Sequence, residues 1–289
     1  MKELNILCVG GDARYRYMCE HLAKRFKCRC LYPDSLPEGA AVICSPDQVN
    51  IRVDVLVLPM LTGVIHEEWG HILPCGRERL LLDELIPLLS PDALVTGGVA
   101  DEQTAAFFRS HGFELTDYFK RRDLAYKNSI PTAEGTLKLA MQERAETVFG
   151  SRVLITGFGC VAKACAKLFA AAGAHVTCAV RRREAAAEAE AAGYCAADTG
   201  GLATLARDCD ILINTVPALL LTEAVLSALP PKAVVIDLAS KPGGTDFEAA
   251  DALGIRCIHA LALPGKVAPM TAGRYIAETV ENIISERGE

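Results

Sequence analysis

The stretch that most constrains the fold lies at residues 152–180, where an apolar run, a glycine-rich turn, an amphipathic run and a second apolar run follow in that order. Gly157, Gly159 and Ala162 form the pattern G-x-G-x-x-A at the turn. Such a turn lets the backbone approach a pyrophosphate at the positive end of the next helix. The stretch therefore predicts a strand–helix–strand unit that binds a dinucleotide through Gly157, Gly159, Cys160 and Val161. The alternative is a tight turn in a Rossmann-like domain that has lost its ligand.

Three arginines follow the second apolar run, beginning 22 residues or so after Gly159. A free ribose 2′-hydroxyl is best met there by Asp or Glu, whereas a 2′-phosphate needs cations. Guanidinium groups bind phosphate in a two-pronged geometry. Arg181 and Arg182 therefore predict NADP(H) rather than NAD(H) as the cofactor. The competing interpretation is that one or two of these arginines are the solvated start of a helix.

Apolar runs alternate with amphipathic runs along the whole chain, which is typical of α/β folds. We predict two domains, a Rossmann-like N-terminal α/β domain and a C-terminal NAD(P)-binding Rossmann domain. The bounds expected are 1–146, 147–270 and 271–289, the last being a helix that returns to the first domain. Helices are also expected over residues 77–89 and from about Pro131, near a helix start, to Gly150.

Loops expected beyond the carboxyl ends of the second domain's strands are rich in Gly, Pro, Ser, Thr and Asn. Ligands of open α/β sheets bind at that edge. We expect Asn214, Thr215 and Pro217 to lie near the nicotinamide ribose. Lys241 and Lys266, in the loops 239–247 and 262–273, suit an anionic substrate group, or are exposed surface lysines.

Polar residues of the first domain gather at two further places. Arg14 follows a Gly-Gly turn at a strand-to-helix junction, which is a natural site for an anion. Lys127, Ser129, Thr132 and Glu134 lie together where the long helix is expected to begin, near the expected interdomain cleft. Glu134 is either a favourable charge in a first helical turn or an acid–base group.

Composition excludes several other classes of protein. The formal net charge of −6 argues against nucleic acid as a partner, and no apolar stretch is long enough to span a membrane. We expect no signal peptide. Most of the 12 cysteines lie in apolar runs and no C-x-x-C occurs, which favours a reducing cytoplasm. His66 and His71 are five residues apart, where a helical zinc motif needs four, so no metal is expected.

Six segments, taken in order and spacing, resemble the family of dipicolinate synthase A subunits: GGDAR, NSIPTAEGT, GFGCVAKACAKLFAAAGAHV, DILINTVP, DLASKPGGTDF and LPGKVAPMTAG. The resemblance covers essentially the whole chain, with Ala162 standing where the family commonly has Gly. It implies that NADP⁺ takes a hydride from dihydrodipicolinate, or its hydroxy-tetrahydro precursor, to form the aromatic diacid pyridine-2,6-dicarboxylate. It also implies that the partner is the flavodoxin-like B subunit of dipicolinate synthase, in the mother-cell cytoplasm during sporulation.

A dicarboxylate substrate needs cationic sites, for which Arg14, Lys127, Lys241 and Lys266 are candidates, with Ser129 and Thr132 beside them. Glu134 and Lys266 are the candidates for the proton acceptor. Two other functions stay open: an NADP-dependent dehydrogenase of the shikimate or methylene-tetrahydrofolate type, and a non-catalytic nucleotide-binding subunit. A homodimer is left open as well.

Overall fold

A computed structural model describes residues 4–76 and 78–288, and its contacts divide the chain into two compact units. Unit 1 comprises Met1–Asn128 and Ala268–Glu289, and unit 2 comprises Ser129–Val267. Each unit is an α/β domain with a parallel sheet, which confirms the predicted fold class. The division falls inside helix α3 (Arg122–Glu143), whereas the sequence placed it after residue 146 because the long helix was assigned whole to the first domain.

Unit 2 contains a six-stranded sheet in the order β12-β11-β10-β13-β14-β15, and every neighbouring pair is parallel. This is the 3-2-1-4-5-6 order of a dinucleotide-binding fold. Its strands are β10 (Arg152–Thr156), β11 (His175–Val180), β12 (Cys195–Asp198), β13 (Ile211–Asn214), β14 (Val234–Asp237) and β15 (Arg256–His259). Its helices are α4 (Cys160–Ala171), α5 (Arg183–Ala191), α6 (Leu202–Ala206), α7 (Glu223–Leu226), α8 (Phe247–Leu253) and α9 (Leu263–Val267).

The two faces of the unit 2 sheet are covered by different helices. Successive side chains of a strand point to opposite faces. Val153 and Ile155 of β10 pack in one buried cluster with residues of α3, α4 and α5. Leu154 packs in a second cluster with residues of α6, α7 and α8. Burial on both faces explains why these strands read as continuous apolar runs.

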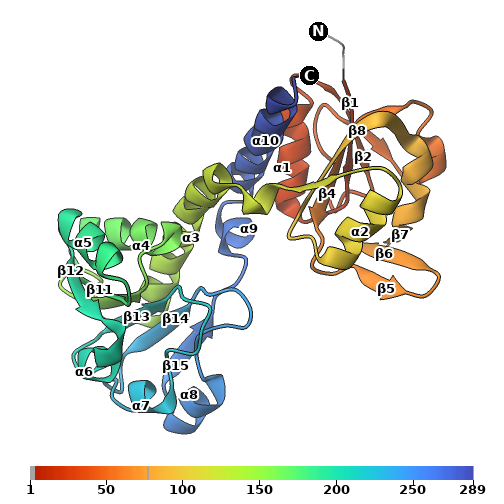
Figure 1. Cartoon of the computed structure of the whole chain (residues 1–289). Coiled ribbons are helices and arrows are strands. Elements are labelled where there is room, and N and C mark those ends of the chain that lie inside the picture. Colours follow the sequence, from red (N-terminus) through yellow and green to blue (C-terminus); the bar gives the residue numbers. More distant parts are fainter. Residues whose placement is uncertain (1–3, 77, 289) are drawn as a thin grey trace. The chain divides into compact units, whose positions relative to one another are not determined.

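Unit 1 contains a second six-stranded parallel sheet, in the order β3-β2-β1-β4-β8-β9. Figure 1 shows this sheet with α1 and α10 running side by side, although they are far apart in the sequence. The strands are β1 (Asn5–Val9), β2 (Lys27–Leu31), β3 (Ala41–Ile43), β4 (Val53–Met60), β8 (Leu89–Gly98) and β9 (Leu115–Asp117). The helices are α1 (Ala13–Leu22), α2 (Glu102–Ser110) and α10 (Pro269–Glu286).

Helix α10 returns to unit 1 as predicted from its amphipathic sequence. Ile276, Val280 and Ile284 lie on one side of the helix and are buried with Met18 and Leu22 of α1. Their spacing of four places them on a single helical face. The prediction of a returning C-terminal helix is confirmed, although α10 begins at Pro269 rather than at residue 271.

The helix predicted over residues 77–89 does not form in residues 78–89. Residue 77 lies outside the described residues. β7 (Glu78–Leu81) instead pairs antiparallel with β6 (Gly70–Cys75), which pairs with β5 (Ile65–Glu67) in a small three-stranded sheet. Two short 3₁₀ turns follow at Leu82–Glu84 and Ile86–Leu88. The spacing of the leucines fits both a helix and a buried strand. The antiparallel pairing of β7 with β6 makes this segment a strand.

The long helix begins earlier than the sequence suggested. Pro131 lies inside α3, which starts at Arg122 and ends at Glu143 rather than near Gly150. Proline was read as a helix start because its missing N–H costs least in the first turn. Here the packing of Ala133 and Ala140 in the unit 2 core supports a helix that contains the proline. Residues 262–273, predicted as a loop, form α9 and the start of α10.

Candidate functional site

A pocket of about 420 Å³ opens at the carboxyl edge of the unit 2 sheet. β10 pairs with β11 on one side and with β13 on the other, so the order of the strands reverses at β10. Ligands of open α/β sheets bind at such a point. The pocket is lined by Gly157, Phe158, Gly159, Ala179, Val180, Arg181, Arg182, Ala185, Thr199, Thr215, Val216, Pro217, Ala218 and Leu220. Six of the residues predicted to bind the cofactor are therefore brought together: Gly157, Gly159, Arg181, Arg182, Thr215 and Pro217.

The glycine turn leaves its backbone open at the start of α4. Gly157 has φ +82°, and a Cβ there would lie 3.0 Å from Val216 Cγ2. A Cβ on Gly159 would meet nothing within 4 Å, so its backbone faces open space. Gly159 is also the N-cap of α4 and provides no side-chain cap. The first N–H groups of α4, at Cys160 and Val161, therefore suit an anion, although neither side chain is part of the pocket lining.

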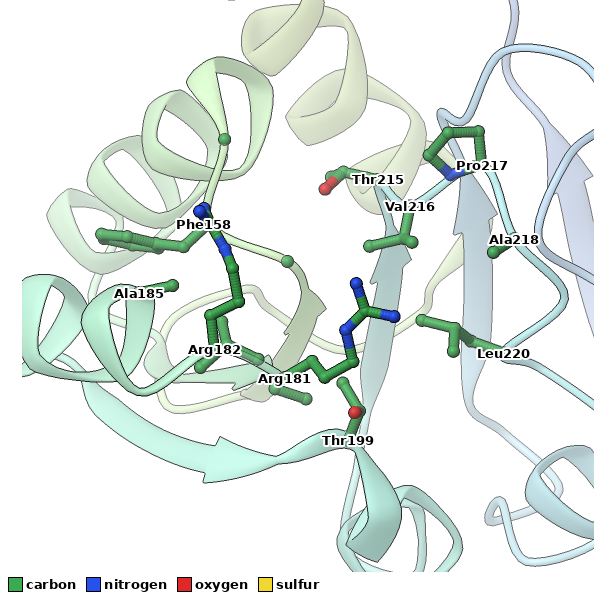
Figure 2. A pocket seen from close by; sticks show the side chains of 14 residues that line it. Phe158, Arg181, Arg182, Ala185, Thr199, Thr215, Val216, Pro217, Ala218 and Leu220 are labelled. Atoms are coloured by element: carbon green, nitrogen blue, oxygen red, sulfur yellow. The ribbon is translucent and has the colours of Figure 1, made fainter.

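Arg181 and Arg182 follow β11 directly and line the same pocket. Figure 2 shows Arg181 extending toward Val216 and Arg182 extending toward Phe158. Both side chains are exposed, and the lining residues include no Asp or Glu. Arg183 opens α5 and is not among them. The pocket thus presents cations where a carboxylate would meet a free ribose hydroxyl.

Asn214 lies behind the pocket wall, and its side chain forms hydrogen bonds inside the protein. It is fully buried at the end of β13, where Thr156 Oγ1 donates to its Oδ1 at 2.5 Å. Its Nδ2 donates to Asp237 Oδ1 at 2.9 Å and to the Val216 carbonyl at 3.2 Å. Thr215 faces the pocket and donates its hydroxyl to the Thr156 carbonyl at 2.6 Å. Asn214 therefore shapes the loop that carries the lining residues.

The predicted catalytic residues do not line this pocket. Glu134 is exposed on α3, at a separate shallow pocket that it shares with Met141 and Leu168. Lys266 is exposed on α9, and Lys241 is exposed in the loop after β14. Their roles stay predictions.

The cations predicted in unit 1 already have acidic partners. Arg14 is 4% exposed, and its Nη2 lies 2.7 Å from Asp12 Oδ2. Lys127 Nζ lies 2.6 Å from Glu278 Oε2 of α10. Of the nearby polar residues, Ser129 is buried and Thr132 is half-buried in α3. Binding a substrate carboxylate at Arg14 or Lys127 would require these ion pairs to be shared or broken.

The Gly-Gly turn of unit 1 is filled by side chains of the protein itself. A Cβ on Gly10 would lie 2.8 Å from Cys75 Sγ of β6, and one on Gly11 would lie 2.3 Å from the Tyr15 ring. Both glycines have positive φ, at 49° and 93°. Although unit 1 shares the strand order of unit 2, protein atoms occupy the approach to its turn. These glycines are explained by packing and turn geometry.

His66 and His71 are cross-strand partners in the β5–β6 hairpin. Their Nδ1 atoms lie 2.7 Å apart, and His66 Nε2 lies 2.9 Å from Asp101 Oδ2 at the N-cap of α2. The spacing of a helical zinc motif does not apply to this pair, because the segment is a β-hairpin rather than a helix. Among the described residues, no group of three or more His, Cys, Asp or Glu could hold a metal ion.

Changing Asp12 to Asn tests the buried pair of unit 1. Asn caps a helix as well as Asp does, so the change removes the charge while keeping the cap of α1. We expect the free energy of unfolding to fall by about 2 kcal/mol, less than for a fully buried pair because Asp12 is half exposed. Urea unfolding at neutral pH measures this loss, with exposed Asp47→Asn as control.

The pH dependence of stability tests the Asp12–Arg14 pair in a second way. Burial opposes ionisation of Asp12, but hydrogen bonds and charge from Arg14 outweigh it and hold the pKa of Asp12 below its ordinary value. The stabilisation is therefore present above the ordinary carboxyl pKa and is lost as the pH falls through the lowered value. The difference between wild type and D12N should shrink on acidification; a difference that grows would contradict this assignment.

The fold and the pocket together define a class: a dinucleotide-binding, dehydrogenase-type domain joined to a second α/β unit. The model of the D-isomer specific 2-hydroxyacid dehydrogenase NAD binding domain matches residues 121–242, which supports a nicotinamide cofactor. The model of the N-terminal domain of the dipicolinate synthase A subunit matches residues 5–119. The dipicolinate synthase A subunit of Bacillus subtilis (strain 168) is 33% identical over 291 residues, or 98% of this chain and 96% of the relative. The chain belongs to the family of dipicolinate synthase A subunits.

Solved structures agree with this membership. The crystal structure of the dipicolinate synthase A subunit from Bacillus halodurans has a TM-score of 0.86 at 32% identity, covering 97% of each chain. The A chain of dipicolinate synthase from Bacillus subtilis has a TM-score of 0.88 at 32% identity, covering 99% of this chain and 97% of that chain. A transhydrogenase from Sinorhizobium meliloti, at 15% identity and a TM-score of 0.69, shares the fold. No helix among the described residues is both long and apolar enough to cross a membrane.

Proposed function

We propose that this chain is an NADP-dependent oxidoreductase subunit that forms dipicolinate from dihydrodipicolinate or its hydroxy-tetrahydro precursor during sporulation. Membership of the family of dipicolinate synthase A subunits and the dehydrogenase-type NAD-binding domain support the reaction class. The observation that carries the choice of NADP is the pair Arg181 and Arg182 in a pocket lined by no carboxylate.

The residues present fit a nicotinamide dinucleotide phosphate. Gly159 leaves open space beside an uncapped helix N-terminus for the pyrophosphate, and the two arginines suit the 2′-phosphate. When bound, the coenzyme supplies the ring that accepts a hydride. Thr215 and Pro217, on the loop after β13, belong to the wall on the nicotinamide side in this proposal. Their position is fixed from behind by the bonds of Thr156 and Asn214.

Holding a dicarboxylate requires cations that are free to bind it. Lys241 and Lys266 fit this role better than Arg14 and Lys127, because the latter two are already paired with acidic residues. The proton acceptor in this proposal is Glu134 or Lys266, both exposed to solvent. Oxidation to an aromatic diacid is favourable in itself, so a modest base suffices.

We place the protein in the cytoplasm, with the flavodoxin-like B subunit of dipicolinate synthase as its partner. The reduced thiols support a reducing compartment, since all of the cysteines are free. The Bacillus subtilis relative is named as one subunit of a synthase, which supports the presence of a second, different polypeptide. A homodimer stays a prediction.

Two measurements test the proposal. Calorimetry should show NADP⁺ binding at least about tenfold more tightly than NAD⁺, because only NADP⁺ offers a phosphate to the arginines. Purified chain with NADP⁺ and fresh product of dihydrodipicolinate synthase should then yield pyridine-2,6-dicarboxylate, followed by its absorbance. Equal affinity for both coenzymes would overturn the NADP assignment. Binding without turnover, with and without the flavodoxin-like partner, would overturn the catalytic role.

A further inference from the structure

The carboxylate of Asp237 is a buried charge next to the wall of the nucleotide pocket. Asp237 ends β14, is 0% exposed and is the register partner of Asn214. Asn214 donates to it and also to the carbonyl of Val216, which lines the pocket. One side chain therefore separates this carboxylate from the pocket wall.

Both oxygens of the Asp237 side chain accept hydrogen bonds from the surrounding loops. Its Oδ1 accepts from Asn214 Nδ2 at 2.9 Å and from the Ala239 amide at 2.8 Å. Its Oδ2 accepts from the Gly244 amide at 3.2 Å and from Thr245 Oγ1 at 2.6 Å. Four donors, three of them N–H groups, therefore surround the two oxygens of this acceptor side chain.

The four donors to this carboxylate in the described part of the chain are neutral groups, so none of them is a counter-charge. Its other strand neighbour, His259, directs its ring to Phe247, with centroids 5.1 Å apart. Lys241, in the adjoining loop, is exposed to solvent. A buried charge acts on its surroundings through a medium of low dielectric constant.

The loops that follow β13 and β14 are closely packed against each other at Gly244. A Cβ on Gly244 would lie 2.2 Å from Asn214 Nδ2 and 2.4 Å from the Val216 carbonyl. The loop after β14 is thus pressed against the loop that carries Thr215, Val216 and Pro217. This contact joins the two loops beside the fully buried carboxylate.

We propose that the charge of Asp237 makes the pocket prefer the oxidised coenzyme over the reduced one. The nicotinamide ring is positively charged when oxidised and neutral when reduced, so a nearby fixed negative charge favours the oxidised form. In an enzyme that consumes oxidised coenzyme, this bias helps to load the reactant and release the reduced product. The inference rests on the proposed function, because it needs a nicotinamide coenzyme in this pocket.

The test compares the dissociation constants of oxidised and reduced coenzyme in Asp237→Asn. This change keeps the size of the side chain and removes its charge, but it also replaces one acceptor oxygen by an NH2 group. Calorimetry should show the ratio of oxidised to reduced dissociation constants rising by about tenfold when this one buried charge is removed. Asp210→Asn is the matched control, since Asp210 accepts from the Arg152 amide at the opposite, amino end of β13. Its ratio should not change.

Thr245→Val separates charge from loop geometry, because it removes one donor and keeps the carboxylate. Both affinities should weaken together in T245V, leaving the ratio as in wild type. An unchanged ratio in D237N, or the same shift in T245V, would overturn the proposal. If D237N fails to fold by circular dichroism, tighter binding of the reduced form by wild type would overturn it. Failure of NADP and NAD to bind at all would instead defeat the proposed function.

Discussion

Replacing Arg181 and Arg182 together with alanine is expected to weaken NADP(H) binding by about a hundredfold while leaving NAD(H) binding nearly unchanged. Each guanidinium forms charge-assisted hydrogen bonds with a phosphate, and a loss of about 1.4 kcal/mol per side chain is a tenfold loss of affinity. Both side chains line the pocket and are exposed, so their removal leaves no cavity in the core. Calorimetry with the four coenzymes measures the effect.

Arg183→Ala is the matched control for this pair. It removes the same charge one residue further on, from the first residue of α5, which does not line the pocket. A loss of NADP(H) affinity as large as that of the double variant would mean that general positive charge, rather than phosphate contact, governs binding. A parallel loss of NAD(H) affinity would mean that the variant had disturbed the pocket itself.

Replacing Gly273 with alanine is expected to lower the free energy of unfolding by about 3 kcal/mol. Gly273 lies in α10, and a Cβ there would lie 2.2 Å from the Arg14 carbonyl and 3.0 Å from the Met18 amide, both in the backbone of α1. Backbone atoms cannot rotate away, so the two helices must separate. The sign of the change in stability is the test, because in an isolated helix the same substitution would raise stability by about 1 kcal/mol.

Urea unfolding followed by circular dichroism measures the loss as a lower midpoint at an unchanged slope. Gly63→Ala is the control in unit 1, because a Cβ there would meet nothing within 4 Å and the residue does not have positive φ. Stability equal to or above wild type in G273A would contradict the close packing of α10 on α1.

The parts of the fold that were predicted correctly rest on local patterns. The turn at Gly157 and Gly159, the apolar strands beside it and the amphipathic α10 can be read from neighbouring residues. Residues 77–89 were misread because leucines at short spacing fit a helix and a buried strand equally well. The pairing of Leu80 with Leu73 decides between them, and that contact is absent from any local pattern.

The candidate site also contains residues that the sequence could indicate and residues that it could not. Arg181 and Arg182 could be placed beside the glycine turn from the sequence, because they follow a strand at a fixed distance from that turn; the structure shows that they line the same pocket. Thr199 lines the same pocket but was not predicted from the sequence. Its position directly after β12 was the signal that could have placed it at the carboxyl edge of the sheet. The pairing of Lys127 with Glu278, separated by 151 residues, had no signal in the sequence.

By itself, the sequence determined the type of each domain, the glycine-rich turn between β10 and α4 and the sign of the charge that follows β11. These properties depend on residues close together in the chain, whose spacing fixes backbone geometry and hydrophobic period. Only the tertiary structure decided which polar groups bind one another inside the protein. Arg14 pairs with Asp12, Asn214 donates a hydrogen bond to Asp237, and Lys127 pairs with Glu278. Burial and ion pairing arise between segments brought together by folding, so no local pattern could separate the groups held inside the protein from those left to bind a ligand.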